Sequence, residues 1–183
     1  MGLKMFGLVL CLFLVSGQAL AADAPDSKTA ANTAESASDK APEPGAQAPE
    51  ESGKYTCKYY SVKLPDGWRA IVPPEETLGN VNAIFATDTG NTVVTMVAGP
   101  SGGEDVKTIA AMFAEQFKAV KQPALKNGQY TFQFPIQNAM ASAWVAAYDG
   151  VFMMSYIAGN TRQGMNFIRT GITSDSYPGL LPQ

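Results

Sequence analysis

Few side chains in this sequence could do chemistry, and the residue types that are missing are the most informative. The chain of 183 residues has no histidine and only two cysteines, Cys11 and Cys57. Without histidine, Ser-His-Asp and Cys-His catalysis, histidine acid–base chemistry and the usual zinc sites are excluded. The cysteines are too far apart for a Cys-x-x-Cys redox pair. We therefore expect no enzyme activity and no cofactor.

Two pairs of adjacent carboxylates remain as candidates for hydrolytic chemistry. Glu75-Glu76 follows two prolines, and Glu104-Asp105 stands at the start of an expected helix. A glycosidase needs two acids that face each other across a cleft, which adjacency in sequence does not provide. We interpret both pairs as solvated charges and rank a hydrolase without histidine last among the possible functions.

Methionine is the remaining residue type that could hold a metal, because thioethers bind Cu(I). Met112 falls on a helical apolar stripe and Met153-Met154 on a strand, so the favoured interpretation is core packing. A copper site is the alternative. The methionines of the expected domain are Met96, Met112, Met140, Met153, Met154 and Met165.

A partner surface is the most specific site that the sequence predicts. Tyr59 and Tyr60 are adjacent, and successive residues of a strand face opposite ways. One of the two is therefore expected at the surface, where aromatic side chains favour partner contacts. We group both with Trp68, Glu75 and Glu76 as the candidate partner surface. The alternative role for the aromatic residues is to cover the sheet or a helix.

Cys57 is the candidate free thiol. It is expected on a strand, where it would be buried as a small apolar residue. The alternative is a reactive thiol that pairs with a second chain. The expected oligomeric state is accordingly a monomer or a weak dimer.

Composition divides the chain into three segments. Residues 1–21 combine Lys4, an apolar run and Ala19-Leu20-Ala21, which predicts a signal peptide cleaved after Ala21. A lipoprotein signal at Cys11 is disfavoured by the large Leu10 before it. Residues 22–53 hold seven acidic and two basic residues and no aromatic residue, which predicts a disordered acidic linker rich in Ala, Pro and Glu. Residues 54–183 have the size of one domain.

The signal predicts that the protein is periplasmic or secreted, and not an integral membrane protein after cleavage. The whole chain has a net charge of −3, but the domain holds ten basic and nine acidic residues. The acidity therefore belongs to the linker, for which a solvated spacer is the expected role. Nothing in this charge balance indicates nucleic acid or an anionic membrane as a partner.

Strand and helix patterns alternate along residues 54–183. Helices are expected at 104–120, with Ser101 and Glu104 as a capping box, and at 161–171, with Asn160 as the cap. Hairpin turns are expected at 88–91, 127–128 and 149–150. The expected strands are 60–64, 69–72 (ended by Pro73-Pro74), 83–87, 92–98, 129–134, 139–148 and 151–158. Hairpins imply antiparallel pairing, so the predicted fold class is α+β, an antiparallel sheet with two main helices packed on it.

The stretch from Tyr60 to Trp68, YSVKLPDGW, resembles the start of DcrB-like and PsbP-like domains, and the later elements follow in the order of those families. The resemblance implies the α/β/α sandwich that these families share with Ran-binding Mog proteins. DcrB-like members are exported bacterial proteins, and PsbP relatives are non-enzymatic assembly or stabilising subunits. The acidic linker and the lack of histidine depart from these relatives.

These observations lead us to expect an exported, non-enzymatic binding or accessory module of the bacterial cell envelope. Its partner would be an unknown envelope protein or a small ligand. The alternative is a periplasmic carrier that holds a small apolar ligand between sheet and helix.

Overall fold

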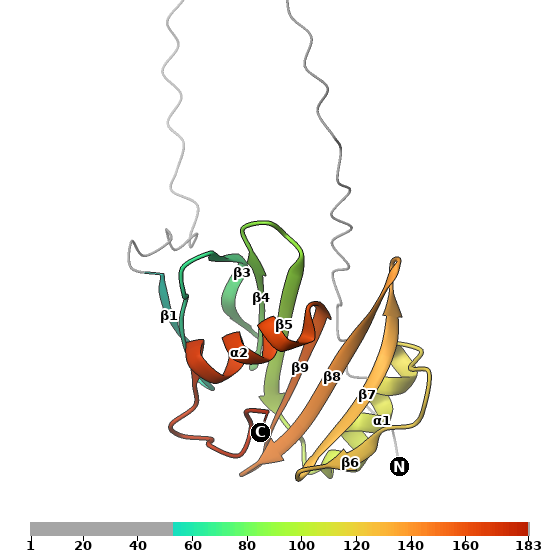
Figure 1. Ribbon diagram of the computed structural model, residues 1–183. Helices are drawn as coiled ribbons and strands as arrows, with labels where there is room; N and C mark the ends of the chain where they lie inside the picture. The colour runs from blue at the N-terminus through green and yellow to red at the C-terminus, as the bar shows by residue number, and fades with distance from the viewer. Residues whose placement is uncertain (1–52, 183) are drawn as a thin grey trace, which may run out of the picture. The chain divides into compact units, whose positions relative to one another are not determined.

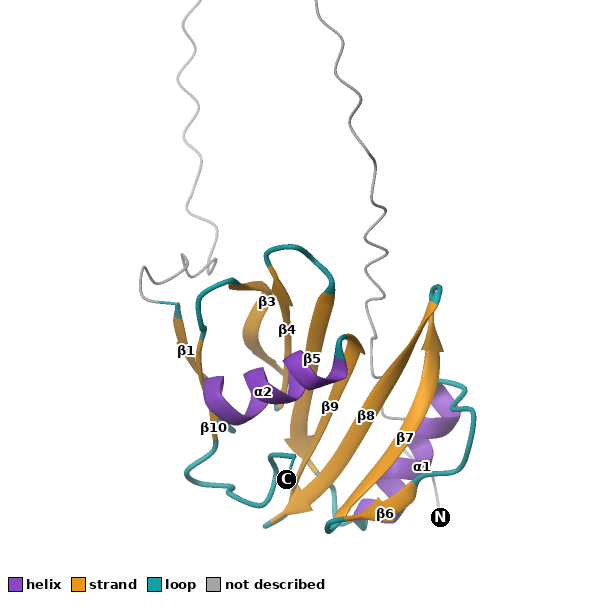
Figure 2. Cartoon of the chain, viewed as in Figure 1, coloured by secondary structure: helices purple, strands orange, loops and turns teal. Residues whose placement is uncertain are grey.

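The computed structural model describes residues 53–182, and the predicted signal peptide and nearly all of the predicted linker lie outside them. The described residues form an α+β fold of two antiparallel sheets and two helices (Figures 1 and 2). No helix in this part of the chain is long and apolar enough to cross a membrane. The elements are β1 (Lys54–Thr56), β2 (Ser61–Lys63), β3 (Trp68–Thr77), β4 (Asn80–Thr87), β5 (Thr92–Pro100), α1 (Val106–Gln116), β6 (Ala124–Lys126), β7 (Gln129–Ile136), β8 (Ala139–Tyr148), β9 (Val151–Gly159), α2 (Thr161–Gly171) and β10 (Ile172–Thr173).

The main sheet has seven strands in the order β3-β4-β5-β9-β8-β7-β6. Strand β9 is central, and the hairpins β4–β5, β6–β7 and β8–β9 form at the expected turns. At two of these turns, Asn127-Gly128 and Asp149-Gly150, both residues have positive φ, which matches the twist of a tight hairpin. The predicted antiparallel α+β class is thereby confirmed.

The two helices lie on opposite faces of the main sheet, as the alternation of side chains along β9 shows. Phe152 and Tyr156 point to α1, where their rings lie 5.7 Å from Phe113 and 5.8 Å from Phe117. Ile157, one residue further along, lies under α2, which packs on β5 and β9. In Figure 1 α2 passes in front of β5, and α1 lies behind β7.

Helix α2 begins and ends where the sequence predicted. The side chain of Asn160 accepts a hydrogen bond from the backbone N–H of Gln163 at 3.1 Å, which caps the helix. Phe167 and Ile168 are fully buried against the sheet. The helix therefore supplies one wall of the main core.

Helix α1 is shorter than the predicted span 104–120. Its cap is Asp105 and not Ser101, because the Asp105 carboxylate accepts the backbone N–H groups of Lys107 and Thr108 at 2.8 and 3.0 Å. The helix ends at Gln116, and Lys118 then takes a positive φ of 54°. Val120 is consequently exposed beside the sheet instead of extending the apolar stripe.

Strand β3 does not end at Pro73-Pro74, as the sequence led us to expect, but runs on to Thr77. It is an edge strand, so a residue without an N–H group can face outward without breaking a ladder hydrogen bond. The pairing with β4 is irregular between Ala70 and Val72 and between Val72 and Glu75. The prolines therefore disturb the register of this edge without ending it.

A small sheet, β1-β2-β10, closes the core on the α2 side. Val62 and Ile172 are its buried residues, and they pair with each other across β2 and β10. The segment after β10 has no regular structure, yet Leu180 is buried in the core. The two ends of the described chain thus pack into the same core.

Candidate binding face

The structure buries the two tyrosines of the predicted partner surface. Tyr59 and Tyr60 are only 2% and 3% exposed, so the expectation that one of them lies at the surface is wrong. They occupy a bend between β1 and β2, where the alternation of a regular strand does not apply. The C-terminal segment covers Tyr59: its ring lies 6.0 Å from that of Tyr177, and its carbonyl accepts the Ser174 hydroxyl at 2.7 Å.

Trp68 and the two glutamates do not form one patch either. Trp68 is half-buried and pairs with Thr87, whereas Glu76 pairs with Val81 at the other end of the β3–β4 ladder. The indole stacks on Phe167, with ring centroids 4.2 Å apart and an angle of 12° between the planes. Glu75 and Glu76 are exposed at the edge. The five predicted residues therefore do not form one surface. The two tyrosines are buried, Trp68 covers the core, and the two glutamates are exposed at the edge of the sheet.

Cys57, the predicted free thiol, is half-buried and directly follows β1. Its Sγ atom lies 3.3 Å from the backbone carbonyl of Tyr60, to which it can donate a hydrogen bond. Burial raises the pKa of the thiol, which favours the neutral form. The phenol oxygen of Tyr60 is buried without a hydrogen-bond partner in the described structure, and burial raises its pKa well above the ordinary value. Neither group is set up as a nucleophile.

A different surface has the properties of a binding site. Helix α2 covers β5 and β9 but leaves the neighbouring strands β8, β7 and β6 open on the same side of the sheet. The register places Thr131 and Trp144 opposite each other, and Gln133 opposite Ser142, on this side. We call these four side chains, with Lys121 and Lys126 beside them, the open face.

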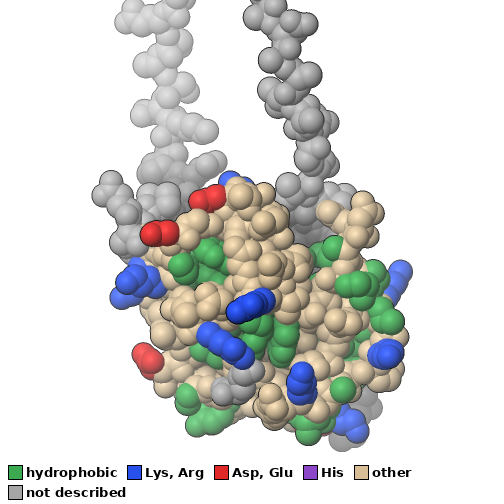
Figure 3. All heavy atoms as spheres, viewed as in Figure 1, with side chains coloured by type: hydrophobic (Ala, Val, Ile, Leu, Met, Phe, Trp, Pro, Cys, Tyr) green, Lys and Arg blue, Asp and Glu red, His purple; other side chains and the backbone are tan. Residues whose placement is uncertain are grey.

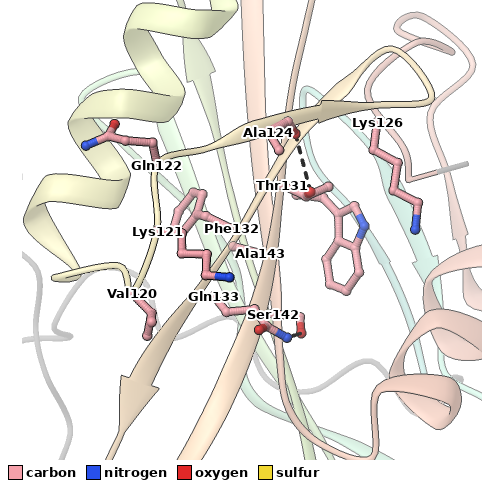
Figure 4. A pocket seen from close by; sticks show the side chains of 11 residues that line it. Val120, Lys121, Gln122, Ala124, Lys126, Thr131, Phe132, Gln133, Ser142 and Ala143 are labelled. Carbon is pink, nitrogen blue, oxygen red and sulfur yellow. Dashed lines mark hydrogen bonds between the residues drawn. The ribbon is translucent and has the colours of Figure 1, made fainter.

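The open face is hollowed into a pocket of about 360 Å³. Its floor is the four strand residues, and its rim is the loop before β6 together with β6 itself. The backbone N–H of Val120 donates to the Gln133 carbonyl at 2.9 Å, which holds this loop along β7 beyond the end of β6. The Nε2 atom of Gln133 donates to the Ser142 hydroxyl at 3.4 Å. Figure 4 shows these two side chains next to each other, with Lys121 and Lys126 on opposite sides of them in this view.

The C-terminal segment limits the open face at its far end. The side-chain amide of Gln129 donates to the Leu181 carbonyl at 2.8 Å, and Gly179 lies against the Tyr148 ring. These contacts bury Gln129, the strand neighbour of Thr131. Only the part of β7 and β8 that lies between this segment and the loop before β6 is available to a ligand.

A second hollow lies on the same side of the sheet, along the outer surface of α2. It is lined by Asn160, Arg162, Gln163, Met165, Asn166 and Arg169. No acidic residue lines this hollow or the pocket of the open face, whereas two lysines and two arginines do. Figure 3 shows Lys and Arg side chains across this face, with Asp and Glu side chains at its left border. The surface is therefore locally basic on a domain that is nearly neutral.

The polar atoms of the open face belong to hydroxyl, amide and ammonium groups, which can donate hydrogen bonds to a ligand. No cluster of three or more His, Cys, Asp or Glu side chains that could hold a metal is found among residues 53–182. Met96, Met153 and Met154 are fully buried, in agreement with core packing, while Met112 and Met140 are exposed.

The sequence of β7 carries a partial signal for this site. The polar residues Gln129, Thr131 and Gln133 alternate with aromatic residues along β7, which marks a half-buried strand. The pattern does not reveal whether a helix or solvent covers the polar side. Trp144 gives no separate signal, because with its neighbours Ala143 and Val145 the sequence of β8 resembles an ordinary apolar strand.

Comparisons with known proteins include a distant structural match. No protein-family model matches the chain, and no curated protein matches it significantly. A crystal structure of a protein from Bacteroides thetaiotaomicron VPI-5482 is similar to 64% of this chain, with 11% sequence identity and a TM-score of 0.41. The chain spans 46% of that protein's length, which is less than half. A similarity of this extent carries no argument about function.

Proposed function

We propose that this protein is an exported binding module without catalytic activity, and that it holds its ligand on the open face. The observation that carries the proposal is the hollow over β7 and β8, where a partly exposed tryptophan lies among polar and basic side chains. Large aromatic residues at the centre of a concave polar surface are typical of recognition sites.

The uneven cover of the main sheet supports this proposal. On the α1 side, Phe132 and Phe134 are buried, because α1 and Phe117 pack on β7. On the opposite side of the same strand, Thr131 is half-buried and Gln133 is exposed. Strand β7 is thus apolar on the side that α1 covers and polar on the other side, as expected of an antiparallel sheet with one solvent-exposed face.

The resemblance to DcrB-like and PsbP-like domains gives further support for an accessory role. We propose that the helix on each side of the main sheet represents the α/β/α sandwich of those families. Their exported, non-catalytic members agree with the predicted signal peptide and with the lack of histidine. Location in the periplasm or outside the cell is part of the same proposal.

The alternative, a carrier of an apolar ligand between sheet and helix, gains no support from the packing under α2. A Cβ atom added to Gly164 would lie 2.5 Å from the Ile157 side chain, so the helix rests directly on β9. Phe167 and Ile168 fill the space beside this contact. A ligand could enter there only if α2 moved away from the sheet.

The experiment uses the chain from Ala22 to Gln183 with Trp68→Phe, in which Trp144 is the sole tryptophan. It is titrated with soluble acidic and neutral oligosaccharides, polyglutamate, and vesicles with and without phosphatidylglycerol. We expect one probe to change Trp144 fluorescence saturably and to slow backbone hydrogen exchange in β7 and β8. Gln133→Ala with Ser142→Ala should weaken that binding.

Met112→Ala, on the exposed side of α1, is the matched control and should leave the affinity unchanged. Binding that is insensitive to the open-face variants, or that protects another surface from exchange, would contradict the proposal. Absence of saturable binding to every probe would also overturn it.

A further inference from the structure

We propose that the ligand of the open face is an acidic saccharide, a chain of sugar rings that carries carboxylate, sulfate or phosphate groups. This inference rests on the proposed function and adds the chemical class of the ligand. Three properties of the open face support it: the basic rim, the aromatic floor, and the pairing of the floor strands β7 and β8 with a neighbour on each side.

The charge of the rim favours an anionic ligand. Lys121 lies in the loop before β6 and Lys126 at the end of β6, so two ammonium groups border one pocket of about 360 Å³. Both side chains are exposed, and no carboxylate lines the pocket to neutralise them. Arg162 and Arg169 add two more cations along α2 on the same side of the sheet. An anionic ligand would be attracted to this surface, and a cationic one repelled.

The floor suits a sugar ring. Trp144 is partly exposed in the pocket and offers an apolar surface against which the C–H groups of a pyranose can pack. Thr131 and Ser142 flank this region with hydroxyl groups, and Gln133 adds an amide. Hydroxyl and amide groups both donate and accept hydrogen bonds, which is what the hydroxyls of a sugar require.

The pairing of the strands disfavours an acidic peptide as the ligand. A peptide commonly binds to a sheet by adding a strand to a free edge. Strand β7 is paired with β6 and β8, and β8 with β7 and β9, so the ladders under the pocket are already formed. Beyond the end of β6, the Val120 N–H donates to the Gln133 carbonyl on the outer edge of β7. The free edge of the sheet belongs to β6, which has only three residues, so over the floor of the pocket a peptide could reach only the side chains.

The hollow shape disfavours an anionic membrane. The floor residues lie on strands, and the loop that holds Val120 and Lys121 rises at their side as a rim. A flat bilayer surface would touch the rim and leave Trp144 and Ser142 without contact. A narrow flexible chain of sugars can enter the hollow and contact both rim and floor.

The test compares two hexasaccharides of equal length, oligogalacturonate and neutral maltohexaose, on the chain from Ala22 to Gln183. We expect saturable binding of oligogalacturonate, measured by calorimetry, and no binding of maltohexaose at the same concentrations. Lys121→Gln with Lys126→Gln should weaken the affinity about tenfold, as expected for two partly exposed charge contacts. Raising the salt concentration should weaken it further.

Lys107→Gln is the matched control, because Lys107 is an exposed lysine on α1, on the other side of the sheet. Trp144→Ala should also abolish binding. Because Trp144 packs against the core and its loss also removes core contacts, the exposed lysine pair is the decisive variant. A double lysine variant that binds like the unaltered chain would overturn the inference.

The outcomes separate the inference from the proposed function. Equal binding of maltohexaose, or tighter binding of polyglutamate or phosphatidylglycerol vesicles, with β7 and β8 protected from hydrogen exchange, would refute the acidic saccharide while the binding face stands. Oligogalacturonate that binds but protects another surface would overturn both.

Discussion

Trp68 lies flat on Phe167, with ring centroids 4.2 Å apart and an angle of 12° between the planes. The contact joins the start of β3 to the middle of α2, which are separated by most of the chain. Phe167 in turn lies 5.3 Å from Phe85 on β4, with an angle of 49° between the planes, so the three rings form one aromatic cluster in the core. The tryptophan that ends YSVKLPDGW is therefore a part of the scaffold.

Removing this ring should destabilise the fold without affecting the open face. We expect Trp68→Ala to lower the free energy of unfolding by about 3 kcal/mol, because it leaves Phe167 without its cover. Trp68→Phe keeps a ring and should cost about 1 kcal/mol. Urea unfolding followed by circular dichroism measures both. Equal stability of the alanine variant and the unaltered chain would show that the stack contributes nothing.

The contact between α2 and β9 predicts that Gly164→Ala lowers the free energy of unfolding when Ile157 is present, but not when Ile157 is replaced by alanine. In Gly164→Ala the new Cβ atom would lie 2.5 Å from Ile157, so we expect a loss of about 1–2 kcal/mol despite the better helix propensity of alanine. With Ile157→Ala in the background the clash disappears. Gly164→Ala should then be neutral or stabilise by up to about 1 kcal/mol. A double-mutant cycle measured by urea unfolding gives both values, and simple additivity would argue against the contact.

The cap of α1 predicts a pH dependence. Hydrogen bonds from the backbone and hydroxyl of Thr108 lower the pKa of Asp105. Because the folded-state pKa is lowered, the ionised cap stabilises the fold above about pH 4, and this contribution is lost as the pH falls through the folded-state pKa. Asp105→Ala should therefore lower Tm by a few degrees at pH 7 and less at pH 3.

Ser101→Ala is the control for this prediction, because Ser101 is the cap that the sequence suggested and the structure does not use. Its Tm should match that of the unaltered chain at both pH values. A larger loss of Tm for Ser101→Ala than for Asp105→Ala would identify Ser101 as the cap instead.

Local chemistry made the later part of the fold predictable. Asn160 before an apolar period, and the turns Asn127-Gly128 and Asp149-Gly150, each specify their backbone without reference to distant residues. The β3–β4 turn was missed because it has Leu78 at φ 53° before Gly79, and leucine is not a residue that marks such a turn. The end of α1 was missed because its apolar period continues past the point where Lys118 turns the backbone.

The candidate site depended on tertiary structure and could be predicted only in part. The burial of Tyr59 and Tyr60 follows from a bend and from the C-terminal segment, more than a hundred residues away, that covers Tyr59. The exposure of Gln133 and Trp144 follows from where α2 crosses the sheet. Periodicity indicates that a strand has two different sides, but not which side a helix will cover.

Cys57 provides a prediction about the thiol that the sequence left open between burial and reactivity. Burial raises its pKa, so the thiolate fraction at pH 8 is smaller in the folded chain than in the unfolded one. In the chain from Ala22, where Cys57 is the sole cysteine, alkylation by iodoacetamide should be several-fold slower in buffer than in concentrated urea. The rate in buffer should still increase with pH above the range where an ordinary thiol has finished titrating. A folded-state rate equal to that in urea would instead identify a reactive thiol, and a disulfide-linked dimer would then be expected on mild oxidation.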